Sequence, residues 1–542
     1  MIKQRVVGRA WRTGALAAAV GLAGVIAAPA QQQPAAPRTN PTQSPGQEAT
    51  RITPDQAKQL FALVDDLLKF SSQETGLPIK STVKRQLTTR SEVEGYLNEK
   101  FNEDEGAKRL QKSEIVLKKF GLLDRDFALK PFLLALLKEQ IEAYYDSKTK
   151  TVNLLDWIGI EEQKPVLAHE LTHALQDQHI DLTKWGDQTP GEVSVNASGD
   201  AEHVAKDELD SAREAVVEGQ ATAVMMDYIL KPMGKSLVKD PEVMDIVKQQ
   251  MAASDNSPVL ARAPLLLSES LLFPYREGLS FEQDVWMDKG QAAAFTGTLD
   301  RPPTSTWEID NPREYDRGRN PAVPFLPDIH PLVDKLYKPY DIGQVGELDV
   351  HILAELFGGD EAARDLTPAW NGGIYWAGQL RSAKTPEEQA KTKSLALFYL
   401  SVWRNSASAQ AFAQLYANSL GRKYSGLKAD LDAEDSAPKE LPPGSSQAIS
   451  EEEVYSTGEG PVVITTRGKM VFVAESFDLD LARKLTALVL DAQGTGQLKM
   501  AGIAQPKGLP DSLEPLTANL IRFYSNCGVM KAVVNAAVQL VK

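Results

Sequence analysis

The feature that constrains this chain most is the string His169-Glu170-Leu171-Thr172-His173. On an α-helix, residues four apart lie on one face with Cβ atoms about 5–6 Å apart, so both imidazoles can reach one zinc ion at roughly 2.0–2.1 Å. Glu170 stands beside the first histidine and one turn before the second, where it can take a proton from a water molecule near the metal. The string therefore predicts a helix with His169 and His173 as zinc ligands and Glu170 as general base.

A catalytic zinc ion needs a third protein ligand, and two regions offer one. His179 follows on the same predicted helix, but Gln176 stands where a glycine would break that helix, so His179 is expected to face away from His173. Glu214 and Glu218 lie on a second predicted helix. Glu218, Glu214 and His179 are therefore the candidates for the third ligand.

The string Val-Glu-Gly-Gln-Ala at residues 217–221, taken with the His169 string, resembles the gluzincin zinc metallopeptidases. In that family a glutamate on a second helix completes the H-E-x-x-H site, in the aminopeptidase branch within an N-E-G-x-A string. This chain has Val217 in place of the asparagine and matches the string from the glutamate onward. The resemblance therefore favours Glu218 as the third ligand, with Glu214 and His179 as alternatives. The resemblance covers about residues 138–230 and implies a zincin-like core, a Zn²⁺ cofactor and peptide-bond hydrolysis. Gly219, next to the favoured ligand, is expected to let its helix approach the zinc helix closely.

Alternating apolar residues before the zinc helix predict a β-hairpin over residues 141–145 and 151–155. The resemblance implies that a peptide substrate lies as an added strand along the edge of such a sheet. Tyr144 and Tyr145 are therefore predicted to bind substrate.

Three further residues are weaker candidates. Tyr315, in a proline-rich run, is a candidate for substrate binding through the oxyanion of the reaction. Asp177 and Asp227 are candidates for orienting the imidazoles of the histidine ligands.

Composition and periodicity predict five regions. A basic start, the apolar run from Ala15 to Ala27 and the small residues Ala28-Pro29-Ala30 are typical of a signal peptide. The regions are a signal peptide (residues 1–30), a disordered linker (31–50), a helical N-terminal region (51–135), a zincin-like catalytic domain (136–380) and an α/β C-terminal domain (381–542). We expect an α+β fold that is mostly helical.

Local signals place several elements within these regions. Thr53 with Pro54 predicts the start of a first helix, and Ser91 with Glu94 predicts a capping box for a second. Past residue 380 the pattern predicts two helices, an acidic linker, a hairpin over about residues 454–474 and further helices.

The charge balance and the signal peptide limit the function. The chain has 73 acidic and 59 basic residues, so it lacks the basic surface that nucleic-acid binding requires. We expect a secreted or periplasmic protein without a membrane span after signal cleavage. The sequence predicts a zinc metallopeptidase acting on proteins or peptides. The alternatives are an inactive zincin-fold binding or scaffold protein, and a zinc hydrolase of a non-peptide amide or ester.

Overall fold

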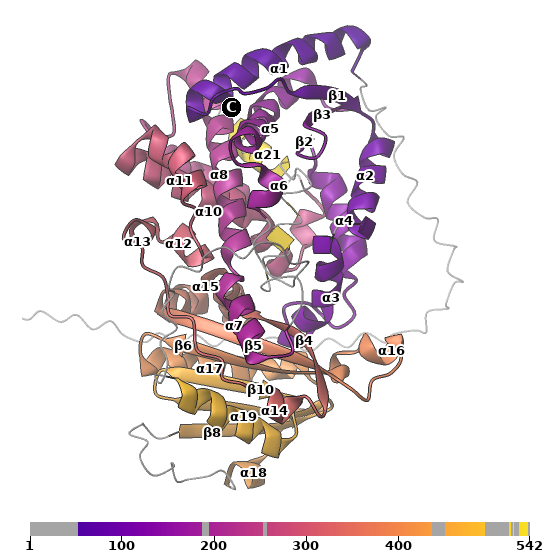
Figure 1. The fold of residues 1–542 in the computed structure, drawn as a ribbon, viewed down its shortest axis with the longest axis vertical. Coiled ribbons are helices and arrows are strands. Elements are labelled where there is room, and N and C mark those ends of the chain that lie inside the picture. Colours follow the sequence, from indigo (N-terminus) through magenta and orange to yellow (C-terminus); the bar gives the residue numbers. More distant parts are fainter. Residues whose placement is uncertain are drawn as a thin grey trace, which may run out of the picture. The chain divides into compact units, whose positions relative to one another are not determined.

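A computed structural model describes most of the chain after the predicted linker. The described residues are 52–103, 105–186, 194–252, 257–435, 450–493 and 531–539, with Thr517, Leu520, Ile521 and Tyr524. The predicted signal peptide and linker lie outside them. The fold is mixed α+β and rich in helices, as expected, with two sheets (Figure 1). No helix in the described part of the chain is long and apolar enough to cross a membrane.

The first helix, α1 (Pro54–Thr75), begins as the sequence predicts. The Thr53 hydroxyl accepts a hydrogen bond from the Gln56 backbone N–H at 3.3 Å, and the Gln56 side chain accepts one from the Thr53 N–H at 2.9 Å. These reciprocal bonds satisfy N–H groups that a helix start otherwise leaves without partners. One face of α1 is buried, including Leu60 and Val64.

The second helix, α2 (Arg90–Glu103), uses a different cap from the predicted pair of Ser91 and Glu94. Glu92 accepts a hydrogen bond from the Thr89 N–H at 2.7 Å, and the Thr89 hydroxyl accepts one from the Glu92 N–H. A hydroxyl residue followed three residues later by glutamate occurs twice here, as Thr89 with Glu92 and as Ser91 with Glu94. A strand ends at Thr88, so Thr89 is the residue at the turn from strand to helix, where a cap must lie. Helices α3 (Glu105–Phe120) and α4 (Leu129–Gln140) follow.

The predicted hairpin is present as β2 (Ala143–Asp146) and β3 (Thr151–Leu155), which pair antiparallel. A third strand, β1 (Lys84–Thr88), pairs parallel with β3 and gives the order β1-β3-β2. Sequence analysis missed β1 within the predicted helical region, because Lys-Arg-Gln-Leu-Thr carries little apolar alternation. Strand β2 therefore lies at an edge of this sheet, and it packs against the next helix.

Three long helices form the centre of the helical part: α5 (Ile160–Ile180), α8 (Leu209–Leu230) and α10 (Leu265–Lys289). Helix α5 packs against α1 and α8, and α8 packs extensively against α10 (Figure 1). The polar segment between α5 and α8 contains two shorter helices, α6 (Leu182–Trp185) and α7 (Ala197–Lys206).

Helices α8 and α10 approach each other closely at two glycines. A Cβ atom on Gly219 would lie 2.3 Å from the Gly278 carbonyl carbon, and one on Gly278 would lie 2.1 Å from the Ala215 carbonyl oxygen. The sequence predicted that Gly219 brings α8 close to α5, the helix of the two histidines. That prediction was wrong, because the helix that Gly219 meets is α10. Gly219 brings α8 close to α10, on another side from α5.

Short elements connect α8 to α10 and α10 to the second sheet. They are η1 (Lys231–Met233), α9 (Val243–Ala252), η2 (Leu260–Arg262), the π-helical turn η3 (Ala293–Gly297), α11 (Thr298–Asp300), α12 (Thr306–Asp310), α13 (Pro312–Asp316) and α14 (His330–Val333).

The second sheet is antiparallel throughout and has the order β4-β5-β6-β10-β9-β8-β7. Its strands are β4 (Tyr337–Gln344), β5 (Trp370–Leu380), β6 (Leu395–Trp403), β7 (Lys428–Ala429), β8 (Ser450–Thr457), β9 (Gly460–Arg467) and β10 (Met470–Glu475). The accompanying helices are α15 (Glu347–Leu366), η4 (Thr367–Ala369), α16 (Pro386–Gln389), η5 (Thr392–Ser394), α17 (Ser406–Lys423), α18 (Leu431–Asp435) and α19 (Leu479–Ala492). Helix α21 (Lys531–Gln539) follows in the sequence but packs against α4, α8 and α9 (Figure 1).

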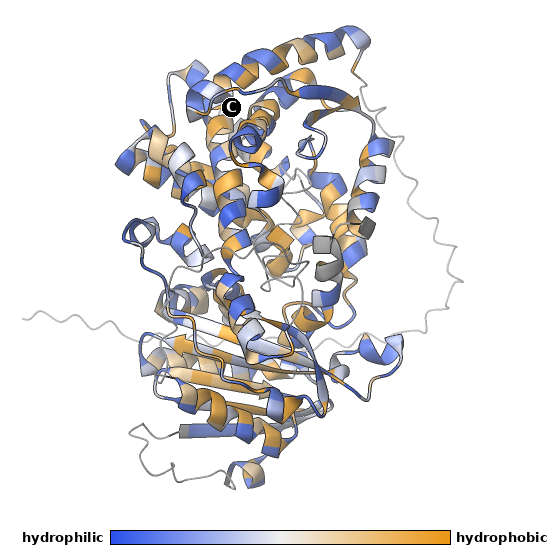
Figure 2. Ribbon diagram, viewed as in Figure 1, coloured by the Kyte–Doolittle hydropathy of each residue, from blue (hydrophilic) through white to orange (hydrophobic). Residues whose placement is uncertain are grey.

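Both faces of this sheet are covered. On β5, Tyr375 belongs to the apolar core that α17 joins through Phe412, whereas Trp376 belongs to the core that α19 joins through Leu485. The middle strands are accordingly hydrophobic, and the outer strand β8 is largely hydrophilic (Figure 2). The core that contains Tyr375 continues into the helices of the N-terminal half.

The hairpin predicted near residues 454–474 is confirmed, but β6 occupies a segment predicted to be helical. Every residue of β6 except Val402 is buried, so the strand shows no alternation of apolar and polar residues. In the second sheet, strands β4 and β5 end at or before residue 380, and the other strands begin after it. The boundary predicted there would separate hydrogen-bonded neighbours β5 and β6.

The glycine contact between α8 and α10 makes a first prediction. Gly278→Ala is expected to lower the free energy of unfolding by about 1–3 kcal/mol, because its methyl group would overlap the Ala215 carbonyl oxygen. The control is Gly421→Ala in α17, where a Cβ meets no atom within 4 Å, and a gain of about 0.4–1 kcal/mol is expected. Urea unfolding of both variants measures the difference, and equal midpoints would contradict the close contact.

Candidate metal centre

Two helices bring three polar side chains together inside the protein. Helix α5 contributes His169 and His173, and α8 contributes Glu218. The two histidine Nε2 atoms are 2.8 Å apart, and Glu218 Oε2 lies 3.1 Å from that of His169 and 3.5 Å from that of His173. His169 and Glu218 are only 1% and 2% exposed. This buried cluster could bind a metal ion.

The spacing of the three atoms fits a single small ion. A triangle with these edges has a circumscribed radius of about 1.8 Å, so a point roughly 2.0–2.1 Å from all three atoms exists on either side of its plane. Imidazole nitrogen and carboxylate oxygen are ligands that suit a divalent metal such as zinc. Three protein ligands also leave a coordination position free.

Packing and local hydrogen bonds hold the zinc-motif helix in place. The Ser71 hydroxyl of α1 donates to the Ala168 carbonyl at 3.0 Å, beside the first histidine. At the start of α5, the buried Gln163 amide donates to the Leu155 and Ile158 carbonyls and so ties the helix to the end of the hairpin. The position of the histidines is therefore determined by both α1 and the small sheet.

In the absence of a metal ion, the pKa values of the three groups in the cluster differ widely. Burial and the positive charge of His173 lower the pKa of His169 to about 4. Burial alone would also lower the pKa of His173, but the Glu218 carboxylate outweighs burial and raises it to about 9. Burial would raise the pKa of Glu218, but the two histidines bring it down to about 2. Near neutral pH the metal-free cluster therefore holds a neutral His169, a cationic His173 and an ionised Glu218.

Glu170 lies within the influence of the same cluster. Its Oε2 accepts a hydrogen bond from the Tyr145 backbone N–H at 2.7 Å, while its buried Oε1 has no hydrogen-bond partner among the described residues. Burial raises the pKa of Glu170 to about 7; the positive charge of His173 opposes this shift, and the negative charge of Glu218 adds to it. A carboxyl group with such a pKa can take up and release a proton at neutral pH.

Gln176 contacts the His173 ring, although sequence analysis did not predict it to orient a histidine. Its Oε1 lies 2.9 Å from His173 Nδ1. The predicted orienting residues make other contacts: Asp177 accepts hydrogen bonds from the Tyr145 hydroxyl and from Lys150, and Asp227 accepts one from the Leu237 N–H. Gln176 could have been found from its spacing, because it stands three residues after His173 on the same helix.

The two alternative third ligands lie outside the cluster. Helix α5 continues through His179, as predicted, and His179 Nε2 lies 3.0 Å from Asp300 Oδ1. Glu214 stands one turn before Glu218 on α8, near Gly186. Within the described chain, the group of side chains that could hold a metal contains Glu218 and neither alternative.

The three tyrosines predicted to bind substrate lie in different surroundings. Tyr144 is buried and stacks on Tyr96, with ring centroids 4.5 Å apart. Tyr145 contacts α5 through two hydrogen bonds. Its N–H donates to Glu170, and its hydroxyl donates to Asp177 at 2.8 Å. The Tyr315 hydroxyl donates to the Arg301 carbonyl, and its ring lies against Phe281 and the Arg301 guanidinium group. Substrate binding by these residues stays a prediction.

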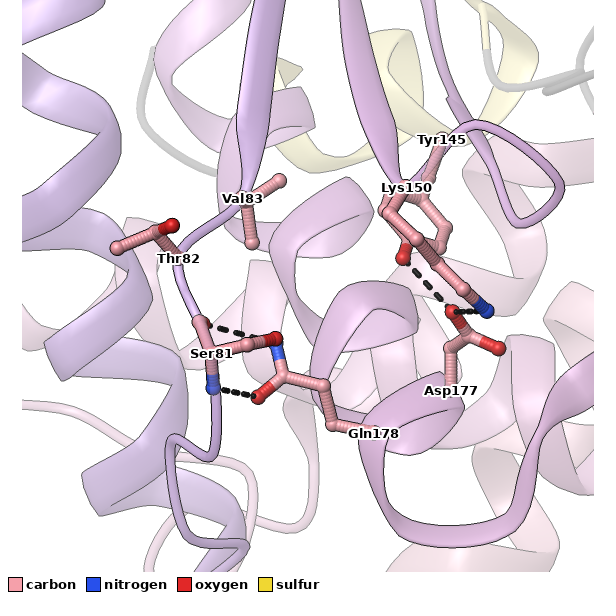
Figure 3. Close-up of a pocket in the computed structure, with 7 residues that line it drawn as sticks. All are labelled: Ser81, Thr82, Val83, Tyr145, Lys150, Asp177 and Gln178. Carbon is pink, nitrogen blue, oxygen red and sulfur yellow. Dashed lines mark hydrogen bonds and ion pairs between the residues drawn. The ribbon is translucent and has the colours of Figure 1, made fainter.

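A small pocket lies beside this stretch of α5. In Figure 3, Tyr145 and Lys150 both reach Asp177, and Gln178 pairs with the backbone of Ser81. The pocket is lined by Ser81, Thr82, Val83, Tyr145, Lys150, Asp177 and Gln178. Tyr145 therefore connects the pocket to Glu170, because its backbone binds that carboxylate.

Comparison with known proteins does not identify a relative with this site. No family model, curated protein or solved structure matches the chain. The function therefore has to be argued from the residues of the site.

The proton on His173 makes metal binding dependent on pH. Below pH 9 a metal ion must displace this proton from His173, whereas His169 is already neutral and Glu218 already ionised between pH 5 and 9. The dissociation constant for zinc is therefore expected to fall up to about tenfold per pH unit as the pH rises from 6 to 8, with up to one proton released for each bound ion. Chelator competition and calorimetry in two buffers measure both quantities. An affinity independent of pH would contradict this assignment.

Proposed function

We propose that this protein is a zinc-dependent hydrolase of peptide bonds, of the gluzincin type. His169, His173 and Glu218 are its metal ligands, and Glu170 is its general base. The observation that carries the proposal is the meeting of two imidazole nitrogens and one carboxylate oxygen at 2.8–3.5 Å from one another, next to a second carboxylate with a free oxygen. A purely structural metal site has no need of that second carboxylate.

Zinc bound by these residues would act as a Lewis acid that polarises the substrate carbonyl and lowers the pKa of water toward about 7. Glu170 would take a proton from the attacking water, whose oxygen bonds to the carbonyl carbon. As the carbon–nitrogen bond breaks, Glu170 would return that proton to the leaving amine. The Tyr145 N–H holds one oxygen of Glu170 at 2.7 Å, which leaves Oε1 to carry the proton.

The sequence supports an exported enzyme that acts on protein or peptide substrates. The basic start, apolar run and small residues of the first thirty positions favour secretion or periplasmic location. A zinc hydrolase of a non-peptide amide or ester would use the same ligands and base, so the choice of substrate depends on the pocket and not on the metal site.

Replacement of the proposed base separates metal binding from catalysis. Glu170→Gln is expected to reduce casein cleavage by at least about 100-fold, because the amide cannot accept the proton, while the three metal ligands stay intact. Zinc stoichiometry and cleavage are measured on the same preparation. The matched control is Glu208→Gln, also buried but bonded to Thr306. Full activity of Glu170→Gln would refute the mechanism.

Loss of a ligand gives a different signature. His169→Ala is expected to bind less than a tenth of the zinc bound by the wild type, because only two of three ligands remain. Wild-type cleavage should stop with a chelator and return when zinc is added. A wild type that binds zinc but cleaves neither casein nor peptides would favour a binding protein with an inactive zincin-type site.

A further inference from the structure

A row of buried amide groups leads from His173 away from the metal cluster. Gln176 Oε1 lies 2.9 Å from His173 Nδ1, and Gln176 Nε2 lies 3.0 Å from Gln220 Oε1. Gln220 Nε2 then reaches the π-helical turn η3. Gln176 and Gln220 are both fully buried. The row thus connects α5, α8 and the segment after α10.

Backbone carbonyls determine which way each amide points. Gln220 Nε2 lies 2.9 Å from the carbonyl oxygens of both Ala294 and Phe295. A carbonyl oxygen can only accept, so the nitrogen of Gln220 must face the turn and its oxygen must face Gln176. Gln176 Nε2 lies 3.0 Å from the Val217 carbonyl, which orients the second amide in the same direction.

The orientation of Gln176 has a direct consequence for His173. With its nitrogen on Val217 and Gln220, Gln176 can present only its oxygen to the His173 ring. An oxygen acceptor requires a proton on Nδ1, so the lone pair of neutral His173 is on Nε2. Nε2 is the atom that faces His169 and Glu218.

The far end of the row is fixed by Thr298 and Glu282. The Thr298 hydroxyl lies 2.6 Å from the Ala294 carbonyl, 3.0 Å from Glu282 Oε1 and 2.9 Å from Gln220 Nε2. Burial raises the pKa of Glu282 well above its usual value, and the hydrogen bonds that its carboxyl group accepts from Thr298 and Gln220 oppose this shift. The Thr298 hydroxyl has the Ala294 carbonyl and Glu282 Oε1 as its acceptors. Every buried donor at this end therefore has an acceptor.

We propose that Gln176, oriented by Gln220 and the η3 turn, is the positioning residue that holds His173 as the Nδ1–H tautomer and aims its Nε2 at the metal. This inference rests on the metal site of the proposed function, but not on peptide cleavage. Because the row ends on backbone carbonyls, the tautomer is set by the fold of α8 and η3 and not by a neighbouring carboxylate.

The test replaces each glutamine with methionine in the full chain, which keeps the side-chain length and removes the polar atoms. Gln176→Met is expected to raise the dissociation constant for zinc by about 10–100-fold, and Gln220→Met by a smaller factor. The control is Gln140→Met, which removes another fully buried amide, at the end of α4, whose oxygen accepts a hydrogen bond from the Ala532 N–H. Its zinc affinity should stay within about twofold of the wild type, whatever stability it loses.

A spectroscopic readout isolates the tautomer. The chain has six histidines, so ¹⁵N labelling of histidine gives a small set of signals. In the zinc-loaded wild type, His173 should show a protonated Nδ1 and a metal-bound Nε2, and Gln176→Met should shift the Nδ1–H signal and speed its exchange with water. Gln220→Met should produce the same change more weakly, and it decides the question if Gln176→Met does not fold.

The outcomes separate the two proposals. Unchanged zinc affinity and unchanged His173 signals in both variants, or equal losses in the Gln140→Met control, would overturn the role of Gln176 while leaving the metal site intact. Failure of the wild type to bind zinc would overturn both proposals. Zinc binding without peptide cleavage would overturn only the proposed activity, because the tautomer is measured without substrate.

Discussion

Two imidazoles and a carboxylate are buried together between α5 and α8, and the surrounding structure is organised by what that burial requires. Polar groups removed from water are unfavourable unless they find partners or a cation. Glu218 lies within 3.5 Å of both histidine nitrogens, and Gln176 satisfies the other side of the His173 ring. Helix α8 must therefore keep Glu218 at one position along α5, since a shift of one residue would remove the carboxylate from both rings.

The packing around α8 provides that constraint from two directions. Gly219, directly after the ligand, touches the α10 backbone at Gly278 so closely that neither residue has room for a side chain. From α5, Gln176 donates hydrogen bonds to the Val217 carbonyl of α8 and to the Gln220 side chain. The residues flanking Glu218 on α8 thus make contacts to both neighbouring helices. Steric contact and hydrogen bonds together fix the position of α8 along its axis and its rotation about that axis.

Local sequence patterns predicted the parts of the site that depend on short-range geometry. The histidine pair needs only the helical repeat, and the hairpin needs only alternation and a turn, so both were found. The cap of α2 was placed two residues late because two overlapping patterns fit equally well, and the end of β1 decides between them. Strands β1 and β6 were missed for opposite reasons: one is too polar for an apolar signal, and the other is buried on both faces.

The sequence by itself determined the two histidines, the glutamate between them and the helix that carries all three, because a spacing of four residues and the helical repeat leave one arrangement. The resemblance of residues 217–221 to the gluzincin string also favoured Glu218 over Glu214. Only the tertiary structure decided that Glu218 completes the cluster, that Gly219 faces α10, and that Gln176 contacts His173. These depend on how separate helices pack, and packing joins residues whose distance in space is not encoded in any local repeat.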